Sequence, residues 1–331
     1  MTKSGKADPA QSMTPEMAAI AARLAAEDAH LPDPTTLPPS VARKQIEGIN
    51  TRWNTDLPAM AAVDRTTVPA ADGTPAPVVI FTPPDAGPGA VIYIHGGGFA
   101  FCSPTTHERA MRCLAIECGM PVIGIRYALA PEAPFPAGLN DVAVAWQAIG
   151  SAPAHYGING GPVGVAGDSA GANLALALML QQIRSGGALP DFGLLFYGVY
   201  GCDFDTPSYR SRATGYGLTR QRMQQYWDWY CPDHERRNDP LATPLAAEDS
   251  DLRRLPPLYL NAAGLDPLLD DSLSLHARLT GIGREDPLVI HDGVIHGFMQ
   301  MTHSLAEARD AFRQAGAWCR RNATKTNPWE D

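Results

Sequence analysis

A serine that could act as a nucleophile lies in the run Gly167-Asp168-Ser169-Ala170-Gly171. The apolar run Val163 to Ala166 precedes it, and a leucine-rich stretch that ends near Gly186-Gly187 follows it. This order predicts a strand, a sharp turn that carries Ser169, and a helix. Small flanking residues permit the tight reversal, and the positive end of the helix lies beside the hydroxyl. The pattern is common by chance, so a glycine-rich helix start capped by Ser or Asp is the alternative.

A second glycine-rich motif could stabilise negative charge on a reacting oxygen. The apolar run Ala90 to Ile94 leads directly into His95-Gly96-Gly97-Gly98-Phe99. Consecutive glycines let the backbone approach a substrate with its N–H groups turned inward, where they can stabilise the oxyanion that forms when a carbonyl is attacked. The N–H of Ala170 would complete this oxyanion hole. His95 itself is interpreted as structural, because a base at the oxyanion position could not serve the nucleophile.

A serine hydroxyl needs a base, and the base needs a carboxylate that orients it. In the chain order expected for this kind of turn, the acid and then the histidine follow Ser169. His296 comes after the last predicted strand, and Gly297 beside it permits a close backbone approach, so His296 is the predicted base. Other downstream histidines fit less well, with His234 in an insertion, His276 in a helix and His291 at a strand end where it could be a core residue.

The predicted acid is Asp266, just past the carboxyl end of the strand expected over 257–262. Carboxyl ends of parallel strands share one edge of a sheet, so Asp266, Ser169 and His296 would meet there. Asp270 and Asp271 follow about one turn later, and we expect them to begin the next helix.

The elements that must position these residues alternate along the chain from about residue 60. Strands are predicted over 63–68, 77–82, 90–95, 121–127, 162–166, 192–198, 257–262 and 287–291. Helices are predicted over 105–118, 138–150, 169–185, 270–281 and 304–322. Short turns join the first strands, which favours an antiparallel start, and the later alternation predicts a mostly parallel sheet with helices on both faces. The fold class is therefore α/β.

Two segments do not fit this alternation. Helices are predicted over 14–30 and 40–51, before any strand, and a long aromatic-rich insertion that contains a helix over 218–230 follows the strand at 192–198. Insertions after the carboxyl end of a strand usually cover the ligand crevice. We expect the two segments to form a cap, and the alternative is a peripheral subdomain without substrate contact.

The composition of the 331 residues is that of an ordinary globular enzyme, with 45% apolar and 18% charged residues. A net charge of −9 without a basic stripe argues against a nucleic-acid partner. The six cysteines have no spacing typical of a metal cluster or a disulfide framework, so we expect free thiols. Neither a signal peptide nor a membrane span is recognised, which predicts a cytoplasmic protein without membrane contact.

These motifs together resemble the hormone-sensitive-lipase-like family of α/β-hydrolases, in its bacterial carboxylesterase branch. The matching runs are His95 to Phe99, Tyr127 to Glu132, Gly167 to Gly171, Asp266 to Asp270 and His296 to Phe298. The resemblance covers nearly all of residues 60–320, in order, and it implies an eight-stranded sheet with a helical cap. The departures are Ala128 for the family's arginine, Ala172 for its glycine, and Cys102 before Ser103 where the family commonly has glycine.

The resemblance implies a nucleophile Ser169, an acid Asp266 and a base His296, with oxyanion donors at Gly97, Gly98 and Ala170. We expect the substrate to contact Phe99, Phe101, Tyr200 and Tyr226. The expected domain ranges are cap helices at 1–55, hydrolase core at 56–200, cap insertion at 201–245 and core again at 246–325.

The expected activity is hydrolysis of short-chain carboxylic esters through an acyl-enzyme, without a metal or an organic cofactor. The expected partner is a small-molecule ester, and the resemblance is compatible with a homodimer formed through the last strand or its flanking helix. A lactonase, amidase or acyltransferase with the same triad is the alternative. A non-enzymatic receptor on this fold is disfavoured, because such receptors lack part of the triad and this chain keeps all three members.

Overall fold

The computed structural model describes residues 12–323 and 328–329. Residues 1–11 of the expected range 1–55, and residues 324 and 325 of the range 246–325, lie outside the described part of the chain.

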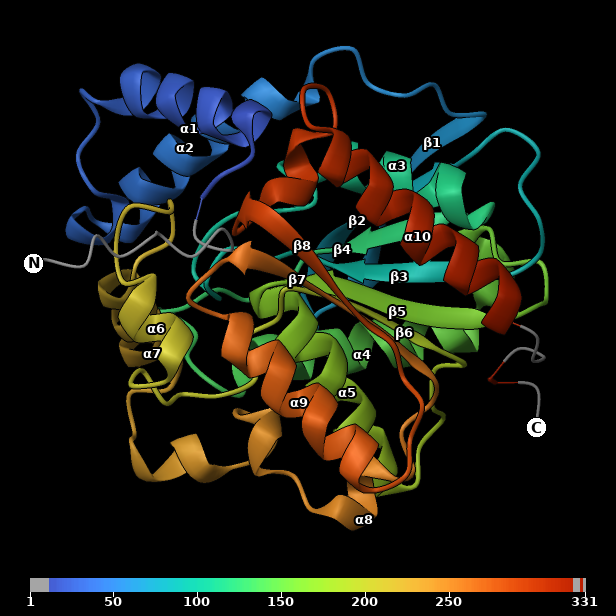
Figure 1. Cartoon of the computed structure of the whole chain (residues 1–331). Coiled ribbons are helices and arrows are strands. Elements are labelled where there is room, and N and C mark those ends of the chain that lie inside the picture. The colour runs from blue at the N-terminus through green and yellow to red at the C-terminus, as the bar shows by residue number, and fades with distance from the viewer. Residues whose placement is uncertain (1–11, 324–327, 330–331) are drawn as a thin grey trace, which may run out of the picture.

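A single eight-stranded sheet with the order β1-β2-β4-β3-β5-β6-β7-β8 forms the centre of the molecule (Figure 1). The strands are β1 (Ala62–Pro69), β2 (Pro75–Thr82), β3 (Ala90–Ile94), β4 (Val122–Ile125), β5 (Val163–Asp168), β6 (Gly193–Phe196), β7 (Leu258–Leu265) and β8 (Leu288–Ile295). The pairs β1–β2 and β2–β4 are antiparallel, and all other pairs are parallel. The predicted α/β class and the antiparallel start of the sheet are confirmed.

Helices cover both faces of the sheet. They are α1 (Pro15–Asp28), α2 (Pro39–Asn50), α3 (Glu108–Cys118), α4 (Ala137–Ser151), α5 (Ala170–Ser185), α6 (Pro207–Ser211), α7 (Arg220–Tyr230), α8 (Asp249–Leu252), α9 (Leu269–Gly281) and α10 (Ala306–Asn322). Successive residues of β3 alternate between two cores: Ile92 and Ile94 pack with the α4, α5 and α9 side, and Val91 and Tyr93 with the α3 and α10 side. This alternation is the strand period of two in a sheet that is buried on both faces.

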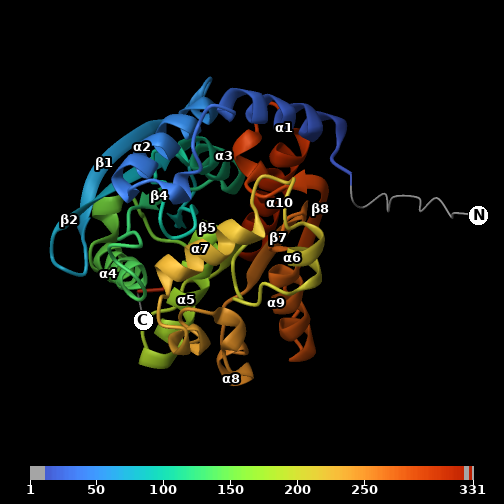
Figure 2. The same ribbon diagram turned by 90° about the vertical axis from the view of Figure 1, so that its left-hand side faces the viewer.

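The segments that break the strand–helix alternation gather at the carboxyl ends of the parallel strands. Helices α1 and α2 lie above α6 and α7 at the left of Figure 1, and the view from that side shows α7 crossing the strand ends (Figure 2). An ion pair at 2.9 Å between Arg222 of α7 and Asp33, in the connection between α1 and α2, joins the two segments. Two of these helices begin at residues that cap a helix N-terminus, Thr14 for α1 and Thr219 for α7.

Two strands run further than the sequence predicts. The apolar runs end at residues 262 and 291, but β7 continues to Leu265 and β8 to Ile295. Glycines and polar residues interrupt the apolar pattern there, while the backbone pairing continues across a register shift between Ala263 and Leu265. His291, expected at a strand end, therefore lies inside β8, and Asp266 and His296 follow their strands immediately.

Within the described residues, no helix is both long and apolar enough to cross a membrane. The cysteines in that part of the chain are all free thiols.

Candidate active site

Ser169 lies at the junction of β5 and α5, in a backbone conformation that residues other than glycine rarely adopt (φ 53°, ψ −120°). Neighbouring backbone packs so closely here that side chains are excluded. A Cβ atom on Gly171 would lie 2.0 Å from the Ile94 oxygen, and one on Gly167 would lie 2.4 Å from Gly171. The glycines on both sides of Ser169 are thus a steric requirement of the turn that holds its hydroxyl at the strand edge.

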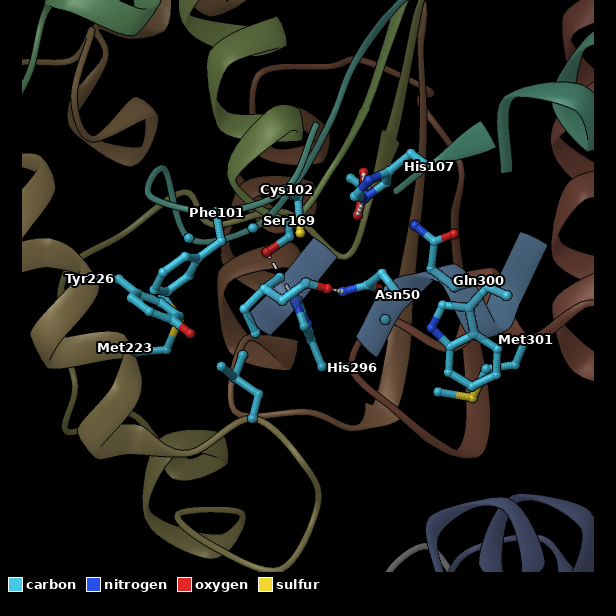
Figure 3. A pocket seen from close by; sticks show the side chains of 17 residues that line it. Asn50, Phe101, Cys102, His107, Ser169, Met223, Tyr226, His296, Gln300 and Met301 are labelled. Carbon is cyan, nitrogen blue, oxygen red and sulfur yellow. Dashed lines mark hydrogen bonds and ion pairs between the residues drawn. The ribbon is translucent and has the colours of Figure 1, made fainter. Parts of the chain in front are cut away.

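The three predicted triad residues form one hydrogen-bonded chain. His296 Nε2 lies 2.9 Å from Ser169 Oγ, and His296 Nδ1 lies 2.6 Å from Asp266 Oδ2. Figure 3 shows the His296 ring directed at Ser169. Asp266 is buried, and its other oxygen accepts a hydrogen bond from the Leu268 N–H at 2.9 Å. With the ring proton on Nδ1, the geometry lets His296 accept the serine proton while Asp266 holds the ring in place.

The glycine loop after β3 lies against this chain. Gly97 and Gly98 line the same cavity as Ser169 and have φ angles of 114° and 60°. A Cβ on Gly97 would lie 2.3 Å from the Phe101 backbone oxygen, and one on Gly98 would lie 2.4 Å from the Tyr226 ring. Ala170, the third predicted donor, is fully buried as the first residue of α5. A side chain at either position would therefore clash with its neighbours, and glycine avoids both the clash and the strain of a positive φ.

A buried carboxylate that the sequence analysis did not single out joins the loop to the serine turn. Asp168 accepts hydrogen bonds from Tyr93 Oη at 2.8 Å and from the Gly96 N–H at 2.9 Å, and His107 Nε2 lies 3.3 Å from it. Burial alone would raise the pKa of Asp168, but the His107 ring and these hydrogen bonds hold the pKa below its usual value. In the sequence, only the position of Asp168 next to Ser169 could have indicated a role for it. Its hydrogen-bond partners are distant in the chain, so the contacts themselves could not be predicted.

His95 is buried and stacks on Tyr127, with the ring centroids 4.4 Å apart. Its Nδ1 lies 2.8 Å from the Gly96 oxygen. Burial and the neighbouring His107 ring lower the pKa of His95 to about 3, so the ring is neutral. These contacts are those of a structural histidine, as the sequence analysis interpreted it.

The cavity above Ser169 encloses about 260 Å³. It is lined by Ile46, Asn50, Trp53, Gly97, Gly98, Phe101, Cys102, His107, Asp168, Ser169, Leu218, Met223, Tyr226, His296, Gly297, Gln300 and Met301. Two of the four predicted substrate contacts, Phe101 and Tyr226, are among these residues. Both segments that break the alternation contribute to the lining, Asn50 from α2 and Met223 from α7, for example.

Phe99 and Tyr200, the other two residues predicted to contact the substrate, are not among the residues that line the cavity. Phe99 adopts a φ of 61°, and its ring stacks on Tyr230 at 3.7 Å in the core. Tyr200 is also fully buried in that core, with its N–H bonded to Asp271 at 2.7 Å. Aromatic composition identified the right segments but could not show which rings point into the core.

Within residues 12–323 and 328–329, no three or more His, Cys, Asp or Glu side chains are arranged to hold a metal ion.

The chain is similar in sequence to a known protein family. A family model described as the alpha/beta hydrolase fold matches residues 91–300. An acetyl esterase of Salmonella typhi is 34% identical over 270 residues, which are 79% of this chain and 80% of that protein.

Solved structures of esterases superpose on this chain over nearly its whole length. A thermostable esterase from Pseudomonas putida superposes with a TM-score of 0.87 at 26% identity, covering 97% of this chain and 100% of that one. A hyperthermophilic esterase from Pyrobaculum calidifontis has a TM-score of 0.85 at 29% identity, covering 94% and 99%. The chain therefore belongs to the hormone-sensitive-lipase-like family of α/β-hydrolases, and the prediction of a carboxylic ester hydrolase is confirmed.

Proposed function

We propose that the protein hydrolyses small carboxylic esters by acyl transfer to Ser169. The observation that carries the proposal is the continuous chain from Ser169 Oγ to His296 Nε2 at 2.9 Å and from His296 Nδ1 to Asp266 at 2.6 Å. Such a chain supplies the nucleophile, the general base and the orienting carboxylate that ester cleavage needs.

In the acylation step, Ser169 Oγ attacks the ester carbonyl carbon while His296 takes the hydroxyl proton. The tetrahedral intermediate collapses as His296 returns this proton to the leaving alcohol, which breaks the bond between the carbonyl carbon and the alcohol oxygen. In deacylation, water gives a proton to His296 and attacks the carbonyl carbon of the acyl-enzyme. The bond between this carbon and Ser169 Oγ then breaks as His296 returns the proton to Ser169 Oγ, which releases the carboxylic acid. Asp266 keeps the ring in the productive tautomer and stabilises its charged form.

The N–H groups of Gly97, Gly98 and Ala170 are the proposed oxyanion donors. The positive φ angles of both glycines and the position of Ala170 at the first turn of α5 support this role. Because the donors are fixed by packing, they need no reorganisation when negative charge develops on the carbonyl oxygen.

The proposed substrates are esters with a short acyl group such as acetate. Phe101, Met223 and Tyr226 limit the space beside Ser169 in a cavity of about 260 Å³, and a relative of this chain is named an acetyl esterase. We propose that the helices within 1–55 and the insertion 201–245 act as the cap, because each contributes side chains to the lining.

The test is hydrolysis of p-nitrophenyl acetate by the wild type and by Ser169→Ala. The variant should lose activity by several orders of magnitude, while Ser151→Ala, an exposed serine at the end of α4, should match the wild type. Turnover by Ser169→Ala near the wild-type level would refute the proposal. Rates on acetate, butyrate, octanoate and palmitate esters test the acyl preference, and a steady rise toward palmitate would contradict it.

A further inference from the structure

The two sides of the catalytic cavity differ in their polar side chains. Phe101, Met223 and Tyr226 lie on one side of Ser169, and Asn50, His107 and Gln300 lie on the other side, where Met301 is beside Gln300 (Figure 3). A plain alkyl ester would offer these three polar side chains no hydrogen-bonding group.

Gln300 has a buried polar atom with unused hydrogen-bonding capacity. The residue is 7% exposed, and its Oε1 atom has no hydrogen-bond partner. Beside it, the ring nitrogens of His107 face Thr106 Oγ1 and Asp168, and Asn50 uses one Nδ2 hydrogen in a bond to the Ile46 oxygen at 2.9 Å. Gln300 is therefore the polar residue on this side of the cavity whose carboxamide oxygen is buried without a partner.

Several buried polar atoms in the described part of the chain lack a partner, but only the one on Gln300 belongs to a residue that lines the catalytic cavity. Buried amide groups are nearly always hydrogen-bonded in proteins, and those that are not require an explanation. A bound substrate group that pairs with the carboxamide provides one here.

The position of Gln300 indicates which part of the ester it would meet. Gln300 belongs to the 3₁₀ turn Phe298–Met301, and its N–H donates to the oxygen of Gly297, the residue after His296, at 3.1 Å. His296 must protonate the leaving oxygen, so the leaving alcohol lies on the His296 side of the carbonyl carbon. The group that reaches Gln300 is therefore part of the alcohol.

We propose that Gln300 determines specificity by binding a free hydroxyl on the alcohol portion of the substrate, so that monoesters of diols and other polyhydroxy alcohols are preferred to simple alkyl esters. This inference rests on the proposed esterase function. A hydroxyl can donate a hydrogen bond, so it can pair with the Gln300 Oε1 atom that has no partner. A site built for a hydroxyl disfavours an alcohol that lacks one, because the buried amide then stays unpaired.

The test compares kcat/KM for propyl and butyl acetate with kcat/KM for 3-hydroxypropyl and 4-hydroxybutyl acetate. The wild type should favour the hydroxylated member of at least one pair. The hydroxyl-to-alkyl ratio should fall about five- to tenfold in Gln300→Leu, the size expected for one hydrogen bond. If Gln300→Leu does not fold, Gln300→Met, which also lacks the amide, should show the same decrease in the hydroxyl-to-alkyl ratio.

Met301→Leu is the matched control, because Met301 is the next residue of the same turn and lines the same cavity without a carboxamide. Its ratio should equal that of the wild type. A second control places the hydroxyl on the acyl side, with ethyl 3-hydroxybutyrate against ethyl butyrate, and this ratio should not respond to Gln300→Leu.

The inference is overturned if the Gln300 variants lower kcat/KM equally for both members of every acetate pair, which would mean that Gln300 has only a structural or water-binding role. It is also overturned if the acyl-side ratio changes and the alcohol-side ratio does not. A wild type that hydrolyses none of the acetates would instead refute the proposed function, so the two failures are distinguishable.

Discussion

Asp168 Oδ1 accepts a hydrogen bond from the Gly96 N–H at 2.9 Å, which fastens the residue before the nucleophile to the first residue of the glycine loop. The two segments proposed to act on the substrate carbonyl, the turn with Ser169 and the glycine loop, are thus joined by one buried carboxylate. Since the proposed mechanism depends on the placement of both, this contact is expected to affect the reaction and not only the stability.

Asp168→Asn should lower kcat about tenfold with little change in KM, because the side chain keeps its size but loses the charge that faces His107. The stability difference should depend on pH in a defined direction. The pKa of Asp168 is held below its usual value in the folded state, so its contribution is present above pH 3.8 and is lost as the pH falls through the folded pKa. Equal kcat values would contradict the positioning role, and a Tm difference that does not shrink as the pH falls below 3.8 would contradict the charge argument.

Asp271 should make the protein less stable as the pH rises. Burial raises the pKa of this carboxyl to about 7, although the N–H groups of Tyr200 and Gly201 donate to it. The folded state binds the proton more tightly than the unfolded state, whose value is near 3.8, so stability falls between pH 3.8 and about 7 and is constant above that range.

Asp271→Asn cannot ionise and retains an oxygen for both N–H groups. The Tm of the wild type should therefore fall relative to this variant between pH 5 and pH 8, as measured by thermal unfolding. The neighbouring Asp270 gives a second test, because its charge is one cause of the raised pKa of Asp271, and Asp270→Asn should move the fall in Tm toward lower pH. Parallel Tm curves for the wild type and Asp271→Asn would show that the buried carboxyl does not titrate in this range.

Alanine at either loop glycine should lower activity by at least about 100-fold, because the proposed oxyanion donors would be displaced. The two cases differ in what the new Cβ meets. On Gly98 it meets the Tyr226 ring, so Gly98→Ala with Tyr226→Ala should recover part of kcat. On Gly97 it meets the backbone oxygen of Phe101, so the same second change should not rescue Gly97→Ala.

Gly186→Ala is the control for this pair, since Gly186 also has a positive φ of 71° but nothing lies within 4 Å of a Cβ there. Its stability should fall slightly and its activity should not change. Rescue of Gly97→Ala by Tyr226→Ala would contradict the steric account.

Arg43 on α2 holds the N-terminal helices against the glycine loop. Its guanidinium donates to the Ala100 and Ala130 oxygens, each at 2.9 Å, and forms a two-pronged pair with Glu132 at 2.9 and 2.6 Å. Lysine cannot reproduce this fork. Arg43→Lys should raise KM more than it lowers kcat and should speed proteolysis between α1 and α2, whereas Arg23→Ala on α1, half exposed, should do neither. Unchanged proteolysis would show that Arg43 does not fasten these helices.

Nearly every element could be predicted from the sequence, because strand and helix periods are local properties. The motifs Gly167 to Gly171 and His95 to Phe99 were also recognisable, because their own glycines indicate a tight backbone. Prediction was weaker where a contact joins distant segments. Asp168, Tyr93 and His107 are far apart in the chain, and Gln300 became conspicuous only because its amide is buried and unpaired in the cavity. Phe99 and Tyr200 lie in the core and not in the cavity lining, and composition could not show this because it does not determine side-chain direction.

The most direct test of the central claim is covalent labelling of the nucleophile. Incubation with diethyl p-nitrophenyl phosphate should add one phosphoryl group per chain, and peptide mass spectrometry should place it on Ser169, with activity lost in proportion to labelling. His296→Ala should slow the labelling strongly, because the serine then lacks its base. Labelling of a different residue, or a fully labelled Ser169 in a protein that still hydrolyses p-nitrophenyl acetate, would contradict the account.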